Sequence, residues 1–327
     1  MDNLIIKNSI LEKIKTYENI IIVRHVKPDG DCMGSSLGLR EILRASFPEK
    51  SIYSVGGKKA DYLEFIGSED EEPSEEVYKR SLLIAVDTAT FGRIDNNHAT
   101  LCPEIIKIDH HLPMDDYGHI NYVREDLPAT CAIIVDLYNT FRKELVMTQR
   151  AAKALFVGMV TDTGRFRYSG VDANFMRLVA ILLEYDLNIE EIYANLYIRE
   201  KEILKLQGYV LKNFKTTNNG VAYFNMSKRV CRKHRVSSSD ASALVNMLDS
   251  IKEHLIWIFF IEHEDGTFRV RIRSRYVAIN ELAERYSGGG HKQASGALVR
   301  NKREMKKMLQ EADLLLLEFK KGNPGVF

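Results

Sequence analysis

The stretch NIIIVRHVKPDGDCMGSSLGLREILRASFPEKSIYSV, residues 19–55, has the pattern of a strand, a helix and a second strand. The apolar, β-branched run at 19–25 predicts a buried strand, and 51–55 predicts another. Between them, residues 34–47 carry apolar side chains at helical spacing. This order favours neighbouring parallel strands covered by helices.

The same alternation continues towards the middle of the chain. Further buried strands are predicted at 81–88 and 104–111, and helices at 3–17, 129–141, 149–160 and 174–185. We therefore expect an α/β domain over residues 1–190, with a parallel sheet and helices on both faces. Residues 191–214 remain helical in pattern but are more polar, which predicts a helical linker.

The last part of the chain has a different order of elements. Strands are predicted at 220–226, 254–262 and 267–274, and helices at 237–250, 278–286 and 302–319. These predict a smaller mixed α/β domain over residues 215–327. Residues 1–199 hold 23 Lys and Arg against 31 Asp and Glu, whereas residues 200–327 hold 23 against 14. An acidic half suits cations and a basic half suits a polyanion, although a solvated surface also explains either charge.

The apolar runs, the N-terminal sequence and the cysteines predict the cellular location of the protein. The longest apolar runs, such as LIWIFFI at 255–261, are far shorter than the roughly 20 residues of a membrane span. The N-terminus lacks a basic start followed by an apolar block, so we expect a cytoplasmic protein without an export signal. The four widely spaced cysteines form no C-x-x-C pair and are expected to be reduced thiols.

Acids and histidines follow several of the predicted strands. In an open parallel sheet, ligands collect beyond the carboxyl ends of the strands, so these side chains are expected to converge. Four segments supply them, the last being a predicted loop after Val160: His25, Asp29 and Asp31; Asp87; Asp109, His110 and His111; and Asp162.

Taken singly, each of these residues has a structural explanation, because an Asp at a strand end is often a helix N-cap or a turn residue. Together, at least four neighbouring carboxylates would repel one another unless cations compensated them. Carboxylates with two imidazoles suit Mn²⁺, Mg²⁺ or Fe²⁺, and the imidazoles favour Mn²⁺ over Mg²⁺. A pair of divalent ions is a common device for hydrolysing phosphate esters.

Five stretches resemble the ordered motifs of the DHH phosphoesterases and of their associated C-terminal domain. They are HVKPDGDCMGS (25–35), AVDTATFGRID (85–95), IDHHLPMDD (108–116), GMVTDTGRFRYS (158–169) and GGGHKQASGALV (288–299). The resemblance spans nearly the whole chain. In length and pairing of domains it is nearest to the nanoRNase branch, which degrades short oligoribonucleotides and removes the 3′-phosphate of 3′-phosphoadenosine 5′-phosphate (pAp).

The resemblance implies a role for each residue at the predicted strand ends. His25, Asp29 and Asp87 would hold one metal ion, and Asp31, Asp87, His110 and Asp162 the other, with Asp87 shared. His111 would contact the scissile phosphate, and Asp109 would orient its neighbours by hydrogen bonds. The implied cofactors are two divalent cations, expected to be Mn²⁺.

In the basic half, the stretch FRVRIRSR at 268–275 places arginines at alternate positions. If it is a strand, Arg269, Arg271 and Arg273 lie on one face, which fits either a solvated edge or an anion site. The tract at 288–291 is expected to be a loop whose N–H groups can approach an anion. With the resemblance, the expected substrate-binding residues are Arg273, Ser274, Gly288, Gly289, Gly290 and His291.

These observations predict a Mn²⁺-dependent phosphoesterase acting on short oligoribonucleotides and on pAp. The nearest alternative is a phosphodiesterase of cyclic di-AMP or of the linear dinucleotide pApA, followed by an exopolyphosphatase or a pyrophosphatase. A non-catalytic RNA-binding module is a further alternative, which the complete set of acids disfavours. Expected partners are short RNAs or small nucleotides, with no membrane, and the resemblance implies a possible homodimer.

Overall fold

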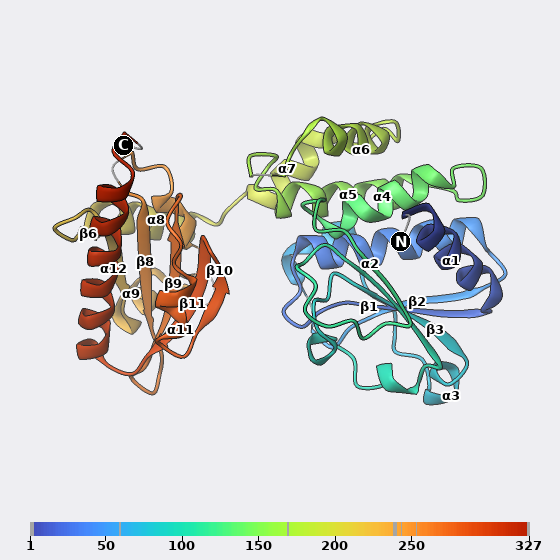
Figure 1. Ribbon diagram of the computed structural model, residues 1–327, viewed down its shortest axis with the longest axis horizontal. Coiled ribbons are helices and arrows are strands. Elements are labelled where there is room, and N and C mark those ends of the chain that lie inside the picture. Colours follow the sequence, from blue (N-terminus) through green and yellow to red (C-terminus); the bar gives the residue numbers. More distant parts are fainter. Residues whose placement is uncertain are drawn as a thin grey trace. The chain divides into compact units, whose positions relative to one another are not determined.

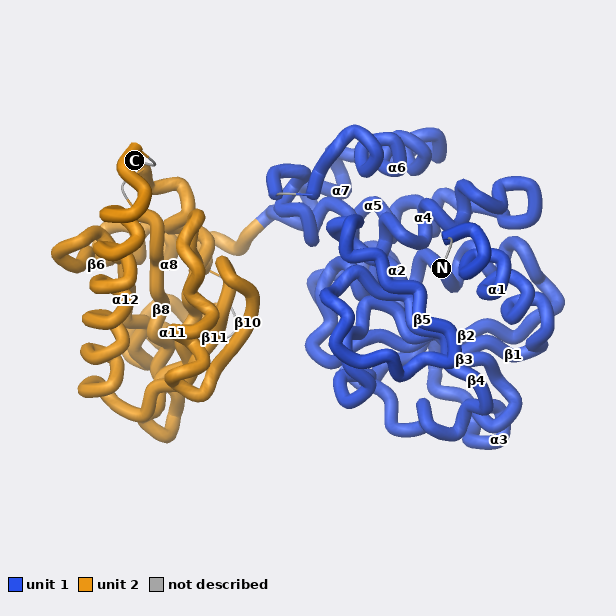
Figure 2. The backbone as a smooth tube through the Cα atoms, in the orientation of Figure 1, with its two compact units in different colours: residues 1–198 blue, residues 199–327 orange. Residues whose placement is uncertain are grey.

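The chain folds into two compact units, residues 1–198 and 199–327 (Figure 2). The computed structural model describes residues 3–58, 60–168, 170–237, 241–242, 244–252 and 254–325. No helix in these ranges is long and apolar enough to cross a membrane.

Unit 1 is built on a five-stranded sheet in which all neighbouring strands are parallel, in the order β2-β1-β3-β4-β5. The strands are β1 Asn19–Val23, β2 Ser51–Val55, β3 Ser81–Val86, β4 Glu104–Asp109 and β5 Ile120–Val123. The predicted parallel α/β sheet is therefore confirmed. Strand β5 was not predicted, because it is a four-residue edge strand in which only Tyr122 is buried.

Large helices cover one face of this sheet. Figure 1 shows α2, α4 and α5 on that side, and their apolar side chains share one core with those of α1 and of alternate sheet residues such as Ile20 and Ile22. The helices are α1 Asn3–Thr16, α2 Gly30–Ser46, α4 Thr130–Thr140, α5 Gln149–Asp162 and α6 Ala173–Leu183. Burial of this face is the main stabilising contribution to the unit.

The opposite face of the sheet has a thinner cover. Ile21, Val23 and Leu83 pack there against Tyr78 of the short helix α3 (Glu75–Tyr78) and against residues of the 3-10 turns η2 (Phe91–Arg93) and η3 (Ala99–Leu101) and the segments beside them. Helical segments thus lie on both faces, as predicted, but they are very unequal in size.

Helices also occupy the segment where the two units meet in sequence. Helix α7 (Ile189–Tyr197) belongs to unit 1 and α8 (Lys201–Asn213) to unit 2. The predicted linker 191–214 therefore contains most of α7 and all of α8. Each of these helices buries apolar side chains within its own unit, Ile192 and Leu196 in α7 and Leu206 and Val210 in α8.

Unit 2 is built on a six-stranded mixed sheet in the order β10-β11-β9-β8-β7-β6. Strands β7 and β8 are parallel, and the other neighbouring pairs are antiparallel. The strands are β6 Lys215–Thr216, β7 Ala222–Met226, β8 Ile256–Glu262, β9 Phe268–Ser274, β10 Gly289–His291 and β11 Ala294–Val299. The predicted mixed sheet is confirmed.

Helices pack on both faces of the second sheet. Helices α11 (Asn280–Glu284) and α12 (Lys302–Gly322) cover the face that contains Val270 and Ile272. Helix α8 and the 3-10 helix η4 (Leu244–Leu248) cover the face that contains Trp257 and Phe259, with Val230 and Cys231 of α9 (Lys228–His234) at its margin.

Two predictions for unit 2 need correction. The helix predicted at 237–250 lies partly outside the described residues; residues 241–242 are α-helical and 244–248 form a 3-10 helix, so only the type of helix differs there. The glycine tract predicted as a loop is largely the edge strand β10, which pairs with β11. A run of glycines gives no apolar alternation, so the sequence pattern could not reveal a strand there.

Candidate active site

The first segment of the site is the N-terminus of α2. His25 follows β1, and Asp29 is the N-cap of α2, where its side chain accepts from the N–H of Cys32 at 3.2 Å. Asp31 lies in the first helical turn and is buried. The helix therefore begins at Gly30, earlier than the predicted residue 34, because the cap starts it before the apolar spacing becomes regular.

The second segment is the residue immediately after β3. Asp87 is buried and has a left-handed backbone, with φ of 51°. Its N–H donates to the carbonyl of Ile108 in β4 at 3.0 Å, which fixes this conformation. A non-glycine residue in this region costs about 1–2 kcal/mol, and such strain is typical of functional sites.

The third segment is the end of β4. Asp109 is the last residue of the strand and is fully buried, and His110 and His111 follow it directly. The side chain of Asp109 accepts from the N–H of His110 at 3.0 Å and contacts Nδ1 of His111 at 2.8 Å. The strand end therefore holds both histidines through one carboxylate.

The fourth segment differs from the prediction, because Asp162 is the last residue of helix α5 and not part of a loop. Helix α5 packs closely on α2: a Cβ atom on Gly34 would lie 2.5 Å from the carbonyl oxygen of Ala154. A Cβ atom on Gly158 would lie 3.1 Å from Oδ1 of Asp31. Glycines at this contact let α5 bring Asp162 close to Asp31.

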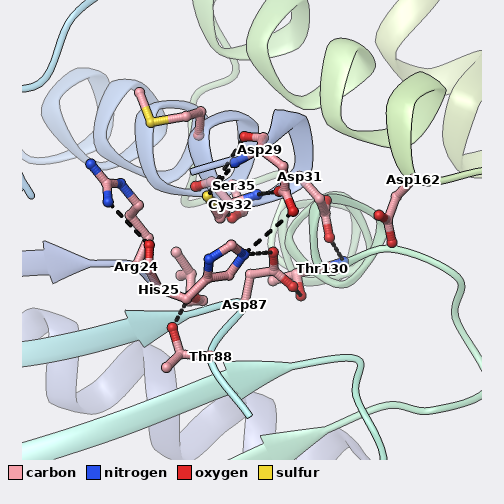
Figure 3. A network of polar contacts seen from close by, with 12 residues as sticks. Arg24, His25, Asp29, Asp31, Cys32, Ser35, Asp87, Thr88, Thr130 and Asp162 are labelled. Atoms are coloured by element: carbon pink, nitrogen blue, oxygen red, sulfur yellow. Dashed lines mark hydrogen bonds and ion pairs between the residues drawn. The ribbon is translucent and has the colours of Figure 1, made fainter. Parts of the chain in front are cut away.

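These segments bring all six predicted metal ligands together, and Figure 3 shows five of them, His25, Asp29, Asp31, Asp87 and Asp162. The ligand atoms of His25, Asp29 and Asp87 form one group with Cys32, and those of Asp31, His110 and Asp162 form a second. A third group, Asp87, His110 and His111, links the other two. Nε2 of His25 lies 3.5 Å from Oδ2 of Asp29 and 3.4 Å from Oδ2 of Asp87. Nε2 of His110 lies 3.4 Å from Oδ1 of Asp87 and 3.3 Å from Oδ2 of Asp162. Asp87 thus directs one oxygen to each group, which is the arrangement that a bridging carboxylate needs.

The negative charge concentrated in this cluster favours the binding of positive ions. Burial, followed by the negative charge of Asp87, raises the pKa of Asp31 well above its usual range. Burial and the charges of Asp31 and Asp87 likewise raise the pKa of Asp162. Divalent cations would remove this repulsion, and the imidazole and carboxylate donors are ligands that such ions accept.

The pKa values of the histidines depend on the same neighbouring carboxylates. Burial lowers the pKa of His25, but hydrogen bonding to Asp29 and Asp87 outweighs burial and raises the pKa above its ordinary value. For His110, burial outweighs the attraction of Asp87, and the pKa is lowered. A neutral imidazole is the form that binds a metal ion, so the pKa of His110 already favours that form.

Some contributors to the site were missed by the sequence prediction. Asp31 accepts from the backbone N–H groups of Thr130 at 2.6 Å and Cys131 at 3.0 Å, both in the first turn of α4. The hydroxyl of Thr130 donates to Oδ1 of Asp87 at 3.1 Å. The amides of a helix N-terminus stabilise negative charge, and the predicted helix start near residue 129 was the available signal.

A buried lysine was also missed. Lys107 of β4 is fully buried, and its ammonium donates to the carbonyls of Ala89 at 2.9 Å and Asp115 at 3.0 Å. Its Nζ lies 3.4 Å from Oδ2 of Asp109, whose other oxygen contacts His111. Burial would raise the pKa of Asp109, but His111 and Lys107 outweigh burial and lower it. Lys107, Asp109 and His111 therefore form one chain of contacts.

Unit 2 contains the predicted substrate-binding residues. Arg269, Arg271 and Arg273 alternate with buried residues along β9, as predicted. The strand register aligns Arg273 with Ala294 of β11, which in turn aligns with His291 of β10. Because directly paired residues share a face of a sheet, Arg273 and His291 lie on the same face. We call Arg269, Arg271, Arg273 and His291 the basic face.

Ser274 lies elsewhere. Its side chain is buried on the opposite side of β9, and its hydroxyl donates to the carbonyl of Val277 at 2.5 Å. The glycines at 288–290 also differ in how closely other atoms pack around them. A Cβ atom on Gly288 would lie 2.0 Å from the carbonyl oxygen of Gly296, so close backbone packing requires glycine there, whereas a Cβ on Gly289 would meet no described atom within 4 Å.

Comparison with known proteins identifies the family. Residues 19–159 match the N-terminal domain of the DHH family, and residues 218–318 match the DHHA1 domain. The chain therefore belongs to the DHH family, as its motifs predicted.

Individual relatives cover nearly the full length. The chain is 36% identical to a probable bifunctional oligoribonuclease and PAP phosphatase NrnA of Streptococcus mutans, over 94% of this chain and 98% of the relative. It is 35% identical to the bifunctional oligoribonuclease and PAP phosphatase NrnA of Bacillus subtilis, over 95% and 99%. Among solved structures, an exopolyphosphatase-related protein from Bacteroides fragilis is similar, with a TM-score of 0.87, 25% identity and coverage of 96% and 98%.

Proposed function

We propose that this chain is a metal-dependent phosphoesterase that hydrolyses short oligoribonucleotides and the 3′-phosphate of pAp. The observation that carries this proposal is the position of Asp87, whose two oxygens each face one group of ligands at 3.4 Å from a histidine nitrogen. The names of the full-length relatives support the choice of substrates.

The proposed cofactors are two divalent cations, and we expect them to be Mn²⁺. His25, Asp29 and Asp87 would hold one ion, and Asp31, Asp87, His110 and Asp162 would hold the other. When bound, such a pair lowers the pKa of a coordinated water and stabilises charge on phosphoryl oxygens. The amides of α4 that donate to Asp31 fix the orientation of this ligand before any ion arrives.

His111 is proposed to bind the scissile phosphate. Its Nδ1 is engaged by Asp109 at 2.8 Å, so Nε2 is the ring nitrogen that can donate to a phosphoryl oxygen. Although burial lowers the pKa of His111, the contact with Asp109 outweighs burial and raises it. A protonated imidazole carries a positive charge and would stabilise the negative charge that develops during hydrolysis.

The basic face of unit 2 is proposed to bind the phosphates that are not cleaved. Burial, followed by the charges of Arg269 and Arg273, lowers the pKa of Arg271 to about 10. A bound anion would relieve this repulsion. The register aligns Gly289 with Gly296 and Gly296 with Arg271, and a Cβ atom on Gly289 would meet no described atom within 4 Å, which leaves room there for a ligand to approach the backbone.

A substrate panel with Mn²⁺ tests the proposal. Initial rates would be measured on RNAs of two to five nucleotides, pAp, pApA, cyclic di-AMP, pyrophosphate and polyphosphate. We expect the highest kcat/KM on short RNA and pAp. A preference for cyclic di-AMP or pApA would replace the proposed substrates by that alternative, and RNA binding without hydrolysis of any compound would contradict an enzyme. Location in the cytoplasm and a homodimer remain predictions; light scattering of the purified chain tests the second.

A further inference from the structure

The first ligand group contains a donor that the predicted ligand set lacks. Cys32, in the first turn of α2, is fully buried. Its sulfur and the ligand atoms of His25, Asp29 and Asp87 all lie within 4.8 Å of one another. The second group, formed by Asp31, His110 and Asp162, offers nitrogen and oxygen donors, and Oδ1 of Asp87 lies 3.4 Å from Nε2 of His110.

Local contacts fix the sulfur in this position. The N–H of Asp29 donates to Sγ of Cys32 at 3.2 Å, while the N–H of Cys32 donates to the Asp29 carboxylate at 3.2 Å. These reciprocal bonds cap α2 and place the thiol on the side of the helix end where Asp29 lies. A buried side chain with this cap has little freedom to turn away.

The imidazole of His25 faces the same space. Its Nδ1 lies 2.7 Å from the carbonyl oxygen of Val26, which leaves Nε2 towards Asp29 and Asp87. The group therefore offers one nitrogen, one sulfur and two carboxylate donors, three of them from the segment around the N-terminus of α2 and one from the end of β3. Four donors of this kind suit a tetrahedral ion such as Zn²⁺ or Co²⁺ better than Mg²⁺ or Mn²⁺.

We propose that Cys32 is a sulfur ligand at the first metal position, so that the two positions prefer different ions. The first would take a thiophilic ion such as Zn²⁺, Co²⁺ or Cd²⁺, and the second an ion that prefers oxygen, such as Mn²⁺. On binding, the metal–sulfur bond replaces the S–H bond and the proton passes to solvent. This inference rests on the proposed metal site but not on the choice of substrate.

A second thiol near the site has a different environment. Sγ of Cys131 lies 3.5 Å from the backbone carbonyl of Asp31, and a Cβ atom on Gly158 would lie 2.2 Å from this sulfur. Cys131 therefore fills the contact between α2, α4 and α5. The side chain of Cys131 packs between these helices. Cys131→Ser therefore serves as a second comparison variant for Cys32→Ser.

Absorption spectroscopy with Co²⁺ tests the inference on the full-length chain. Co²⁺ bound to a thiolate shows an intense sulfur-to-metal charge-transfer band in the near ultraviolet, which carboxylate and imidazole ligands do not produce. We expect this band during titration of the metal-free protein, and we expect Cys32→Ser to abolish it while weaker visible bands persist. Cys102→Ser, a buried thiol on the other face of the sheet, is the matched control and should retain the band.

Competition with Cd²⁺ gives a second readout. Cys32→Ser should weaken Cd²⁺ binding at least about tenfold and Mn²⁺ binding much less. Co²⁺ binding without the charge-transfer band would overturn the inference, as would a band that survives in Cys32→Ser and disappears in Cys131→Ser. Neither result would affect the proposed function, which is judged separately by hydrolysis of pAp and short RNA. Failure of both Co²⁺ and Cd²⁺ to bind would also overturn the inference, whereas hydrolysis of pAp and short RNA with Mn²⁺ would still decide the proposed function.

Discussion

Unit 1 gathers acids and histidines at one end of a parallel sheet, whereas unit 2 aligns arginines along one face of a mixed sheet. In unit 1, parallel strands all end at the same edge, so residues from distant parts of the sequence meet there. In unit 2, the strand register aligns neighbours across the sheet. The first arrangement concentrates ligands around a point, and the second places positive charges in a row along one strand.

The largest expected effect comes from removing the residue shared by both ligand groups. Asp87→Ala should lower kcat/KM at saturating Mn²⁺ by about a thousandfold or more, because several kcal/mol of metal-dependent stabilisation would be lost. Asp126→Ala is the matched control, since Asp126 pairs with Arg124 at the surface. Wild-type turnover in Asp87→Ala would contradict a centre built around Asp87.

A smaller effect is expected at Lys107, which positions Asp109 and through it His111. Lys107→Met should lower kcat by about 10- to 100-fold with little change in KM. It should also reduce the free energy of unfolding by about 3–5 kcal/mol, since the buried carboxylate of Asp109 keeps His111 but loses its cationic partner Lys107. Assays below the melting temperature and the NMR signal of the His111 Nδ1 proton separate the two effects.

The partly exposed Lys153 supplies the control for this variant, because it pairs with Glu191 at the surface. Lys153→Met should leave both kcat and the His111 signal unchanged. An unaltered His111 signal in Lys107→Met would show that the lysine serves stability alone.

The basic face gives the next effect in size. Arg273→Ala should raise KM for a dinucleotide by about tenfold, the equivalent of about 1.4 kcal/mol, because a charged contact to phosphate is lost. Mn²⁺ affinity should stay the same, as measured by calorimetry. Arg300→Ala, an exposed arginine beyond β11, is the control. A fall in Mn²⁺ affinity with constant KM would reverse the roles proposed for the two units.

The smallest effect concerns the stability of the metal-free protein. Asp31 and Asp162 have raised pKa values, chiefly through burial, so the folded chain keeps protons that the unfolded chain releases above roughly pH 4. The free energy of unfolding therefore falls as the pH rises above roughly pH 4. We expect the Tm of chelator-treated protein to drop by a few degrees between about pH 5 and pH 7.

Mn²⁺ addition and the variant Asp31→Asn test whether the free energy of unfolding falls as pH rises. The raised pKa of His25 adds to the trend above roughly pH 6.5, and the lowered pKa of His110 opposes it. Mn²⁺ should remove most of the decline, and Asp31→Asn should make it shallower. A Tm that rises with pH in the metal-free protein would refute the electrostatic account of the cluster.

Much of unit 1 could be predicted from sequence, because its strands are continuous apolar runs that end in acids and histidines. The edge strands β5 and β10 could not, since one has a single buried residue and the other is mostly glycine. At the site, the predicted metal ligands were recognisable from motifs. Lys107 and Cys32 were not, because a lysine in a strand and a cysteine in a helix acquire their roles only from neighbours distant in the chain.

The glycines between α2 and α5 have a consequence for how the site can vary. A methyl group on Gly158 would overlap Cys131 of α4 and crowd Asp31 of α2, so α5 would have to move away from both helices. Such a movement would widen the distance between Asp31 and Asp162 without changing either residue. The ionic radius accepted at the proposed second metal position would then depend on helix spacing, and we expect a single substitution outside the ligands to alter metal selectivity.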